Sequence, residues 1–266
     1  MPLWLLSIIL GIVEGLTEFL PVSSTGHLLI SEHLLNIDPA GFLRSDLFNV
    51  VVQAGAVLAV VPLFRTRFAM LARIHEPASQ VFLAKILTAF FITCVGGFIM
   101  EKKHFKLPEE IQPVAWALFI GGVIFIAVEI AVRGRSLPDA ISWPVAITIG
   151  FAQLIAAGFP GASRSGSTII LALVVGASRV SATEFSFLVG IPTMLAASVL
   201  KIFKAVHHPA PDAVPTDWTL LILASVVAAV VSFVAVKWLL RYVQSHTFIG
   251  FGIYRIIVGT LLLLFL

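Results

Sequence analysis

Two short segments of this chain combine acidic, hydroxyl, imidazole and guanidinium groups within otherwise apolar surroundings. They are residues 14–27 (EGLTEFLPVSSTGH) and residues 160–168 (PGASRSGST). Ionisable groups at membrane depth cost roughly 2.5 to 3.5 kcal/mol each for Asp, Lys or Arg, so they persist mainly where they form a functional site. We therefore expect the chemistry of this protein to lie in these two segments.

Glu14 and Glu18 are four residues apart, so a helix places them on one face. Two carboxylates in a site of low dielectric constant repel each other unless a cation, a proton or an arginine lies between them. Mg²⁺ commonly uses one or two carboxylates and completes its shell with water and phosphate oxygens. The pair therefore predicts a divalent-cation site, for Mg²⁺ or Ca²⁺, unless the two acids simply reach the membrane surface.

A run of hydroxyl groups follows Pro21, where a new helix would begin. Ser and Thr are ordinary N-caps, but the free N–H groups and positive dipole end of a helix also form a phosphate site. His27 lies one helical turn after Ser24, which predicts that its imidazole activates or orients the Ser24 hydroxyl. A purely structural histidine is the alternative.

Arg164 in the second segment lies among serines and between Gly161 and Gly166, which permit close backbone approach. A guanidinium group binds phosphate bidentately and stays charged, so Arg164 is predicted to bind phosphate. The alternative is a buried ion pair with Glu18 or Glu14, which would open when phosphate arrives. The other candidates for substrate binding are polar residues or glycines: Ser23, Thr25, Gly26, Ser163, Ser165, Gly166, Thr168 and Gln53. For Gln53 the alternative is a structural hydrogen bond between two helices.

The composition places these segments in a membrane protein. The chain has 266 residues, of which 59% are hydrophobic and 12% charged, whereas soluble domains have about 25% charged residues. The basic residues stand in short loops and form no continuous patch, which argues against nucleic acid despite the net charge of +3. Cys94 is the only cysteine, so an intramolecular disulfide and a cysteine metal cluster are excluded.

Six apolar stretches have about the length needed to cross a bilayer; they are 46–64, 81–100, 111–132, 182–203, 217–240 and 248–266. Arg255 in the last stretch needs a partner, for which Glu184 is one candidate. Regions 3–35 and 141–177 are interrupted at Pro21 and Pro160, and the pieces after each break are only about 18 Å long. We predict an all-α, polytopic membrane protein with about six transmembrane helices and two re-entrant helix-loop-helix hairpins.

The two interrupted regions also match each other. A shift of 139 residues superposes Gly11 on Gly150, Glu14 on Gln153, Pro21 on Pro160 and Ser24 on Ser163. This predicts a single membrane domain, 1–266, built from two repeats of approximately 1–135 and 136–266. An odd number of spans between the hairpins makes the repeat inverted, so the broken helices should meet near the membrane midplane. The match also favours Ser24 over Ser23 as the functional serine, because only Ser24 is superposed on a serine of the second region, Ser163.

Basic residues in the loops predict the orientation, because Lys and Arg accumulate on the cytoplasmic side. Eight of them fall on one side of the predicted topology: Arg65, Arg67, Arg73, Arg133, Arg135, Arg179, Lys237 and Arg241. Both termini are then expected outside.

Residues 14–27 and 160–168 resemble the signature segments of the undecaprenyl-diphosphate phosphatase family of the bacitracin-resistance type. Residues 184–188 (EFSFL), 253–255 (IYR) and the chain length agree with that family. The resemblance implies hydrolysis of undecaprenyl diphosphate to the monophosphate and inorganic phosphate, with a divalent cation. It also implies recycling of the lipid carrier of cell-wall synthesis, at a site open to the outer face of the bacterial inner membrane.

Carried over by position, the resemblance implies Ser24 as nucleophile and His27 as its activating partner. Glu14 and Glu18 would be metal or acid–base carboxylates, and Arg164 would bind the phosphate. A lipid-phosphate transporter or flippase is the main alternative, since inverted re-entrant repeats are typical of transporters; a non-catalytic scaffold is another. Prenyl diphosphate and membrane lipids are the expected partners, and the sequence is compatible with a homodimer.

Overall fold

The computed structural model describes residues 1–73, 75–103, 105, 110–208 and 214–265, and within them every regular element is a helix. The α-helices are α1 (Leu3–Thr17), α2 (Ser24–Leu34), α3 (Asp46–Val60), α4 (Arg65–Ala72), α5 (Pro77–Lys102), α6 (Ile111–Ala131), α7 (Trp143–Gly158), α8 (Arg164–Val174), α9 (Arg179–His207), α10 (Trp218–Tyr242) and α11 (Ile249–Phe265). Two 3₁₀ turns, η1 (Phe42–Arg44) and η2 (Val61–Phe64), precede α3 and α4.

Five of the six predicted spans are confirmed by helix length and composition. They are α5, α6, α9, α10 and the continuous segment Asp46–Leu71, in which η2 and α4 extend α3 beyond the predicted end at residue 64. The sixth, predicted at 248–266, is the 17-residue helix α11, at the lower limit for crossing a bilayer. Leu266 lies outside the described residues. The chain is thus an all-helical, multi-pass membrane protein.

The two interrupted regions form the predicted hairpins, α1–α2 and α7–α8. Helices α2 and α8 have 11 residues each, which gives about 16 Å and is too short to cross a bilayer. Each is preceded by a serine with positive φ, 74° at Ser23 and 69° at Ser163. The hydroxyl of each serine accepts a hydrogen bond from the backbone N–H three residues later, so both are N-caps.

The predicted register of the repeat is wrong after the turn. The equivalent N-caps, Ser23 and Ser163, are 140 residues apart rather than 139. Two residues separate Pro160 from its serine, whereas one separates Pro21 from Ser23. Ser24 therefore corresponds to the first helical residue of α8, so the repeat gives no reason to prefer Ser24 over Ser23.

Before the turn, residues that the 139-residue shift superposes pack in equivalent ways. A Cβ atom at Gly11 would lie 2.6 Å from the carbonyl oxygen of Ala224 in α10, and one at Gly150 would lie 2.9 Å from that of Ala89 in α5. Such small residues let helices approach closely within a membrane. The N-terminal hairpin thus packs on α10 and the second hairpin on α5.

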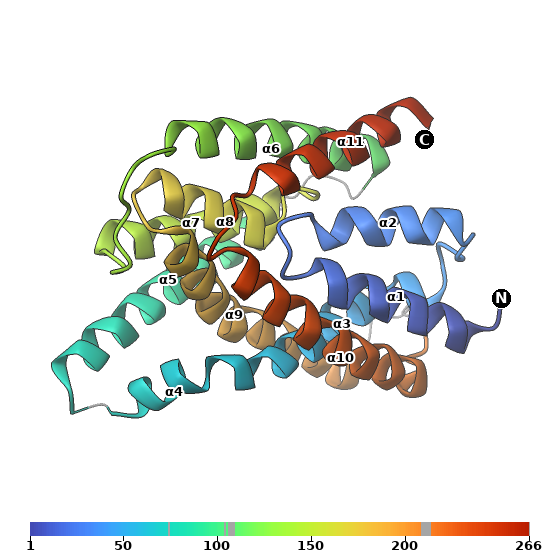
Figure 1. Ribbon diagram of the computed structural model, residues 1–266. Coiled ribbons are helices and arrows are strands. Elements are labelled where there is room, and N and C mark those ends of the chain that lie inside the picture. The colour runs from blue at the N-terminus through green and yellow to red at the C-terminus, as the bar shows by residue number, and fades with distance from the viewer. Residues whose placement is uncertain (74, 104, 106–109, 209–213, 266) are drawn as a thin grey trace.

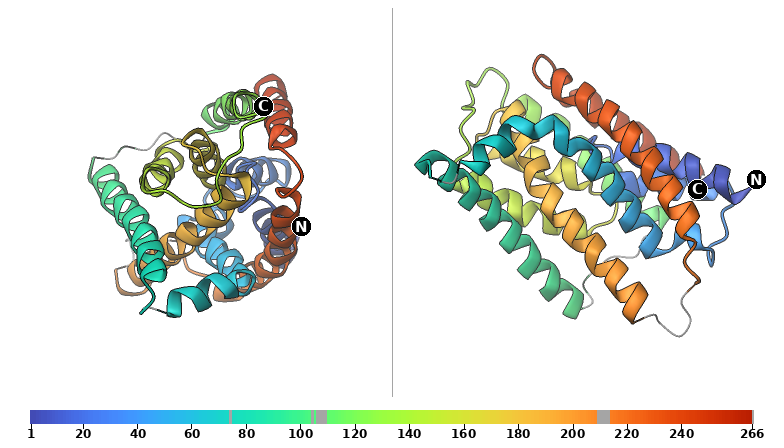
Figure 2. Two further views of the ribbon diagram at one scale, coloured as in Figure 1. Left: turned by 60° about the vertical axis from the view of Figure 1, so that its left-hand side comes forward. Right: turned by 90° about the horizontal axis from the view of Figure 1, so that it is seen from below.

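This exchange of partners brings the two halves of the chain together. Helix α3 packs on both α9 and α10, and α6 packs along α11 (Figure 1). The axes of helices α5, α9 and α10 are roughly parallel, with α10 running opposite to the other two (Figure 2, right). Because each hairpin lies against a long helix from the opposite half of the sequence, the turns of both hairpins are held within one bundle.

Arg255 of α11 ties these turns together. Its side chain is fully buried, and Nη1 donates to the carbonyl oxygen of Pro21 at 3.4 Å. Nη2 donates to the carbonyl oxygens of Gly161 and Ala162, both at 3.2 Å, and to that of Ala117 in α6 at 3.1 Å. One guanidinium group therefore bonds to the backbone of both hairpin turns.

The suggested pairing of Arg255 with Glu184 is wrong. Glu184 instead accepts hydrogen bonds from Arg67 at the start of α4, with 2.7 Å between Arg67 Nη2 and Glu184 Oε2. Backbone carbonyls, three of them at the interrupted helices and one in α6, accept hydrogen bonds from Arg255 in place of a carboxylate.

Candidate active site

Glu18 joins the two polar segments. Its Oε2 accepts a hydrogen bond from the Ser24 hydroxyl at 2.7 Å, and its Oε1 pairs with Nη2 of Arg164 at 2.8 Å. Only 6% of Glu18 is exposed, so the ion pair is shielded from solvent. Of the acid, hydroxyl and imidazole that were expected to meet the arginine of the second hairpin, the acid and the hydroxyl do so, whereas the imidazole of His27 bonds elsewhere.

A cavity of about 360 Å³ lies against this group. Seven of the predicted site residues line it: Glu18, Ser23, Ser24, Thr25, Gln53, Ser163 and Arg164. They include the first residues of both α2 and α8, so the positive dipole ends of two helices meet at the cavity. Helix N-termini and a guanidinium group together make a site suited to an anion, and phosphate above all.

Glu14 does not line the cavity. It is 1% exposed and close enough to Glu18 for the two carboxylates to interact, yet neither of its oxygens has a hydrogen-bond partner within the described residues. A buried carboxylate without a partner calls for a proton or a cation. No group of three His, Cys, Asp or Glu residues in the described part of the chain could hold a metal. Glu14 and Glu18 are the residues that would hold a divalent cation, with water and phosphate oxygens as its other ligands.

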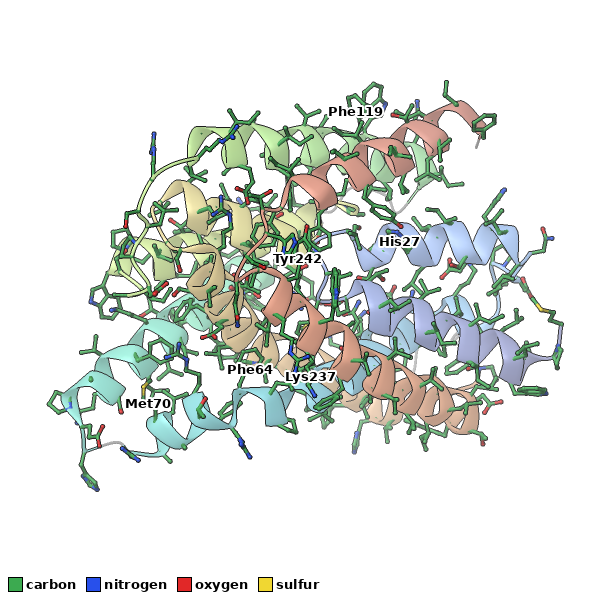
Figure 3. The ribbon with its side chains drawn as sticks, viewed as in Figure 1. His27, Phe64, Met70, Phe119, Lys237 and Tyr242 are labelled. Atoms are coloured by element: carbon green, nitrogen blue, oxygen red, sulfur yellow. The ribbon has the colours of Figure 1, made fainter. Side chains whose placement is uncertain are left out.

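The predicted contact between His27 and Ser24 is not what the structure shows. Nδ1 of His27 donates to the carbonyl oxygen of Ser23 at 2.7 Å, so in the neutral ring Nε2 accepts from the Tyr254 hydroxyl, at 2.6 Å. Figure 3 shows His27 near the start of α2, where α11 passes. The turn at Ser23 thus directs the Ser24 hydroxyl toward the end of α1 and the imidazole toward α11. His27 holds the turn, and Glu18 is the partner of Ser24.

Four predicted substrate-binding residues do not line the cavity: Gly26, Ser165, Gly166 and Thr168. The N–H groups of the two glycines bond to the N-cap hydroxyls. The hydroxyl of Ser165 donates to the carbonyl oxygen of Leu20 at 3.0 Å and so links the hairpins. The hydroxyl of Thr168 donates to the carbonyl oxygen of Arg164 at 2.8 Å. These groups satisfy backbone atoms at the helix starts, so their role is structural.

Three polar residues of the cavity were not predicted: Thr93, Gln153 and Thr193. Nε2 of Gln153 donates to the Thr93 hydroxyl at 2.8 Å, while its buried Oε1 has no partner in the described part of the chain. The superposition of Gln153 on Glu14 in the repeat was a signal for this residue. Thr93 and Thr193 lie in apolar spans without a motif, so the sequence offered no such signal for them.

Comparison with known proteins identifies the family of the chain. The family described as "Bacitracin resistance protein BacA" matches residues 7–261. A protein of Rhizobium johnstonii named undecaprenyl-diphosphatase is 49% identical over 257 residues, which cover 96% of this chain and 94% of the relative. Proteins of the same name from Xylella fastidiosa and Xanthomonas euvesicatoria are each 46% identical, covering 98% of this chain and 97% and 96% of the relatives. The chain belongs to the bacitracin resistance protein BacA family.

Proposed function

We propose that this protein hydrolyses undecaprenyl diphosphate to undecaprenyl phosphate and inorganic phosphate, and so recycles the lipid carrier of cell-wall synthesis. The observation that carries the proposal is the Ser24–Glu18–Arg164 group at the meeting point of two helix N-termini. The name undecaprenyl-diphosphatase, shared by relatives that match nearly the whole chain, supports the same reaction.

The chemistry follows from the contacts. The Ser24 oxygen attacks the terminal phosphorus and its proton passes to Oε2 of Glu18, while the bond from phosphorus to the bridging oxygen breaks and undecaprenyl phosphate leaves. Water then hydrolyses the phosphoserine and frees inorganic phosphate. Phosphoryl transfer depends mainly on positioning and on stabilising negative charge. In this proposal Glu18 takes the place of His27 as the partner of the nucleophile.

Arg164 and the helix N-termini are the groups that stabilise this charge. Arg164 uses Nη2 for Glu18, and a guanidinium group has five N–H donors in a planar fork, so others remain for phosphate oxygens. The same side chain neutralises Glu18 in the absence of substrate. An ion pair in the empty site and a phosphate contact in the loaded site are therefore compatible roles for Arg164.

We further propose that Glu14 and Glu18 hold a divalent cation. When bound, such an ion adds positive charge beside the phosphate oxygens. The buried, unpartnered carboxylate of Glu14 supports this assignment.

The test is phosphate release from a prenyl diphosphate by the protein purified in detergent, with and without a chelator. We expect release in the untreated sample and a loss of at least about tenfold with chelator, because Lewis-acid stabilisation is worth several kcal/mol. Added Mg²⁺ or Ca²⁺ should restore the rate. Release that is insensitive to the chelator would show that a proton, rather than a metal ion, neutralises Glu14. No release in any sample would refute the hydrolase itself.

A transporter or flippase remains the second candidate, because the chain has two broken helices that meet inside the bundle. Transport requires binding groups but no nucleophile, and the contact between the Ser24 hydroxyl and Glu18 therefore favours the hydrolase. The exposed apolar side chains, among them Phe91, Trp116 and Phe151, suit membrane lipids and would also suit a homodimer.

For location, we propose the bacterial inner membrane, with both termini and the mouth of the active site on the outer face. The support is the bias of loop arginines, including Arg65, Arg133 and Arg179, toward one side of the topology. An epitope at either terminus should then react with antibody on intact spheroplasts. Reaction only after lysis would reverse the orientation.

A further inference from the structure

A second cavity adjoins the catalytic one and has no role in the reaction described above. It also has a volume of about 360 Å³, and it shares Thr25, Val50 and Gln53 with the catalytic cavity as lining residues. We call it the vestibule. The three shared residues make the two spaces neighbours, and Ser24 lines only the catalytic cavity.

The walls of the vestibule carry two ion pairs. Nε of Arg44 lies 2.9 Å from Oε2 of Glu32, and these side chains are 28% and 5% exposed. Nζ of Lys201 lies 2.9 Å from Oδ2 of Asp46, and these are 41% and 74% exposed. The first pair is therefore inside the protein and the second is at its surface, so charged groups continue from the interior to solvent.

Amides lie between the ion pairs and the catalytic cavity. Gln53 lines both spaces, and Asn49 lines the vestibule. The Oδ1 atom of Asn49 is buried without a hydrogen-bond partner in the described portion of the chain. Asn49 and Gln53 thus add amide groups to the polar lining of the vestibule.

We propose that the vestibule is the exit for inorganic phosphate, with Arg44 and Lys201 as a weak phosphate subsite along it. The proposal rests on the proposed function, because that reaction generates phosphate beside Ser24. Both cations are already paired with carboxylates, so they attract an anion without trapping it, as a conducting path requires. The prenyl product has an apolar chain and would be excluded from such a charged passage.

The test compares Lys201→Gln with Lys204→Gln. Lys204 lies on the same helix and also pairs with an acid, Glu101, at 3.2 Å, but it does not line the vestibule. A third variant carries two substitutions, Arg44→Gln and Glu32→Gln. It removes the whole ion pair between these residues, so no buried carboxylate is left without its partner. Formation of the prenyl monophosphate is followed at increasing concentrations of inorganic phosphate. We expect the inhibition constant of phosphate to rise about three- to tenfold in the vestibule variants, through loss of charge-assisted contacts, and to stay near wild type in Lys204→Gln.

A second measurement needs no turnover. Inorganic phosphate should raise the unfolding midpoint of the wild type and of Lys204→Gln at constant ionic strength, and should do so less in the vestibule variants. Equal shifts and equal inhibition constants in all four proteins would overturn the vestibule even if the protein is an active phosphatase. An equal loss in Lys204→Gln would also overturn it, as a general effect of charge. A shift that depends on Lys201 in a protein without turnover would refute the proposed function and leave the phosphate subsite standing.

Discussion

Replacing Ser24 with alanine is expected to lower phosphate release from a prenyl diphosphate by at least about a thousandfold, because the substitution removes the proposed nucleophile. The fold should persist. The hydroxyl makes its hydrogen bond to Glu18, and loss of one such bond costs about 1 to 3 kcal/mol. Release is measured on purified protein, and the unfolding midpoint is measured on the same sample.

Ser23→Ala is the matched control, because Ser23 lines the same cavity but serves as the N-cap of α2. It should lose about 1 kcal/mol of stability through the missing cap, and its turnover should fall far less than that of Ser24→Ala. Full turnover in Ser24→Ala would refute the mechanism. Acid quenching of the wild type with labelled substrate should trap phosphate on Ser24. An inactive Ser24→Ala protein combined with no trapped phosphate would mean that Ser24 orients a water molecule instead.

The meeting of the two hairpins was predicted from the inverted repeat, which places broken helices together near the membrane midplane, and the cost of polar groups in lipid favours the same contact. Glu18 and Arg164 are 146 residues apart in sequence, yet each needs an opposite charge at membrane depth. Hydropathy alone likewise located five of the spans, since crossing a bilayer demands a long apolar helix. The cost of polar groups in lipid thus favours both of these predictions.

The partner of Ser24 could not be predicted in the same way. Spacing along a helix indicates which residues share a face, but Ser24 stands at the start of α2, where the positive φ of Ser23 sets the direction of the chain. The actual partner of His27, Tyr254, is 227 residues away in α11. Local spacing carries no information about such a contact.

Bonds to the backbone were equally hidden from sequence reasoning. Arg255 donates to four carbonyl oxygens, which have no side-chain signature, and three of them, those of Pro21, Gly161 and Ala162, are available because two helices are interrupted. The hydroxyls of Ser165 and Thr168 bind carbonyls in the same manner. A segment rich in Ser and Thr therefore indicated an interruption of the helix more reliably than it indicated which hydroxyls face the cavity.

Arg164 provides the second large expected effect. Arg164→Ala should lower phosphate release by about a hundred- to ten-thousandfold, because the phosphate loses its charged donor in a shielded site. It should also destabilise the protein by about 3 to 5 kcal/mol, since Glu18 is left as a buried carboxylate beside Glu14. Both losses are measured on one preparation, so a fall in activity from misfolding is recognised by the unfolding midpoint.

Gly190 allows the position of Arg164 to be tested without removing its charge. A Cβ atom at Gly190 in α9 would collide with Nη1 of Arg164, so Gly190→Ala should displace the guanidinium group. Alanine in a helix interior is favoured over glycine by about 1 kcal/mol, and the backbone should tolerate the change. Gly97→Ala in α5 is the control, because a Cβ atom there meets no atom within 4 Å. We expect turnover to fall at least about tenfold in Gly190→Ala, as displacement of a positioned group commonly costs, and to stay near wild type in Gly97→Ala. Equal turnover in the two variants would show that phosphate binding does not depend on where the guanidinium group is held.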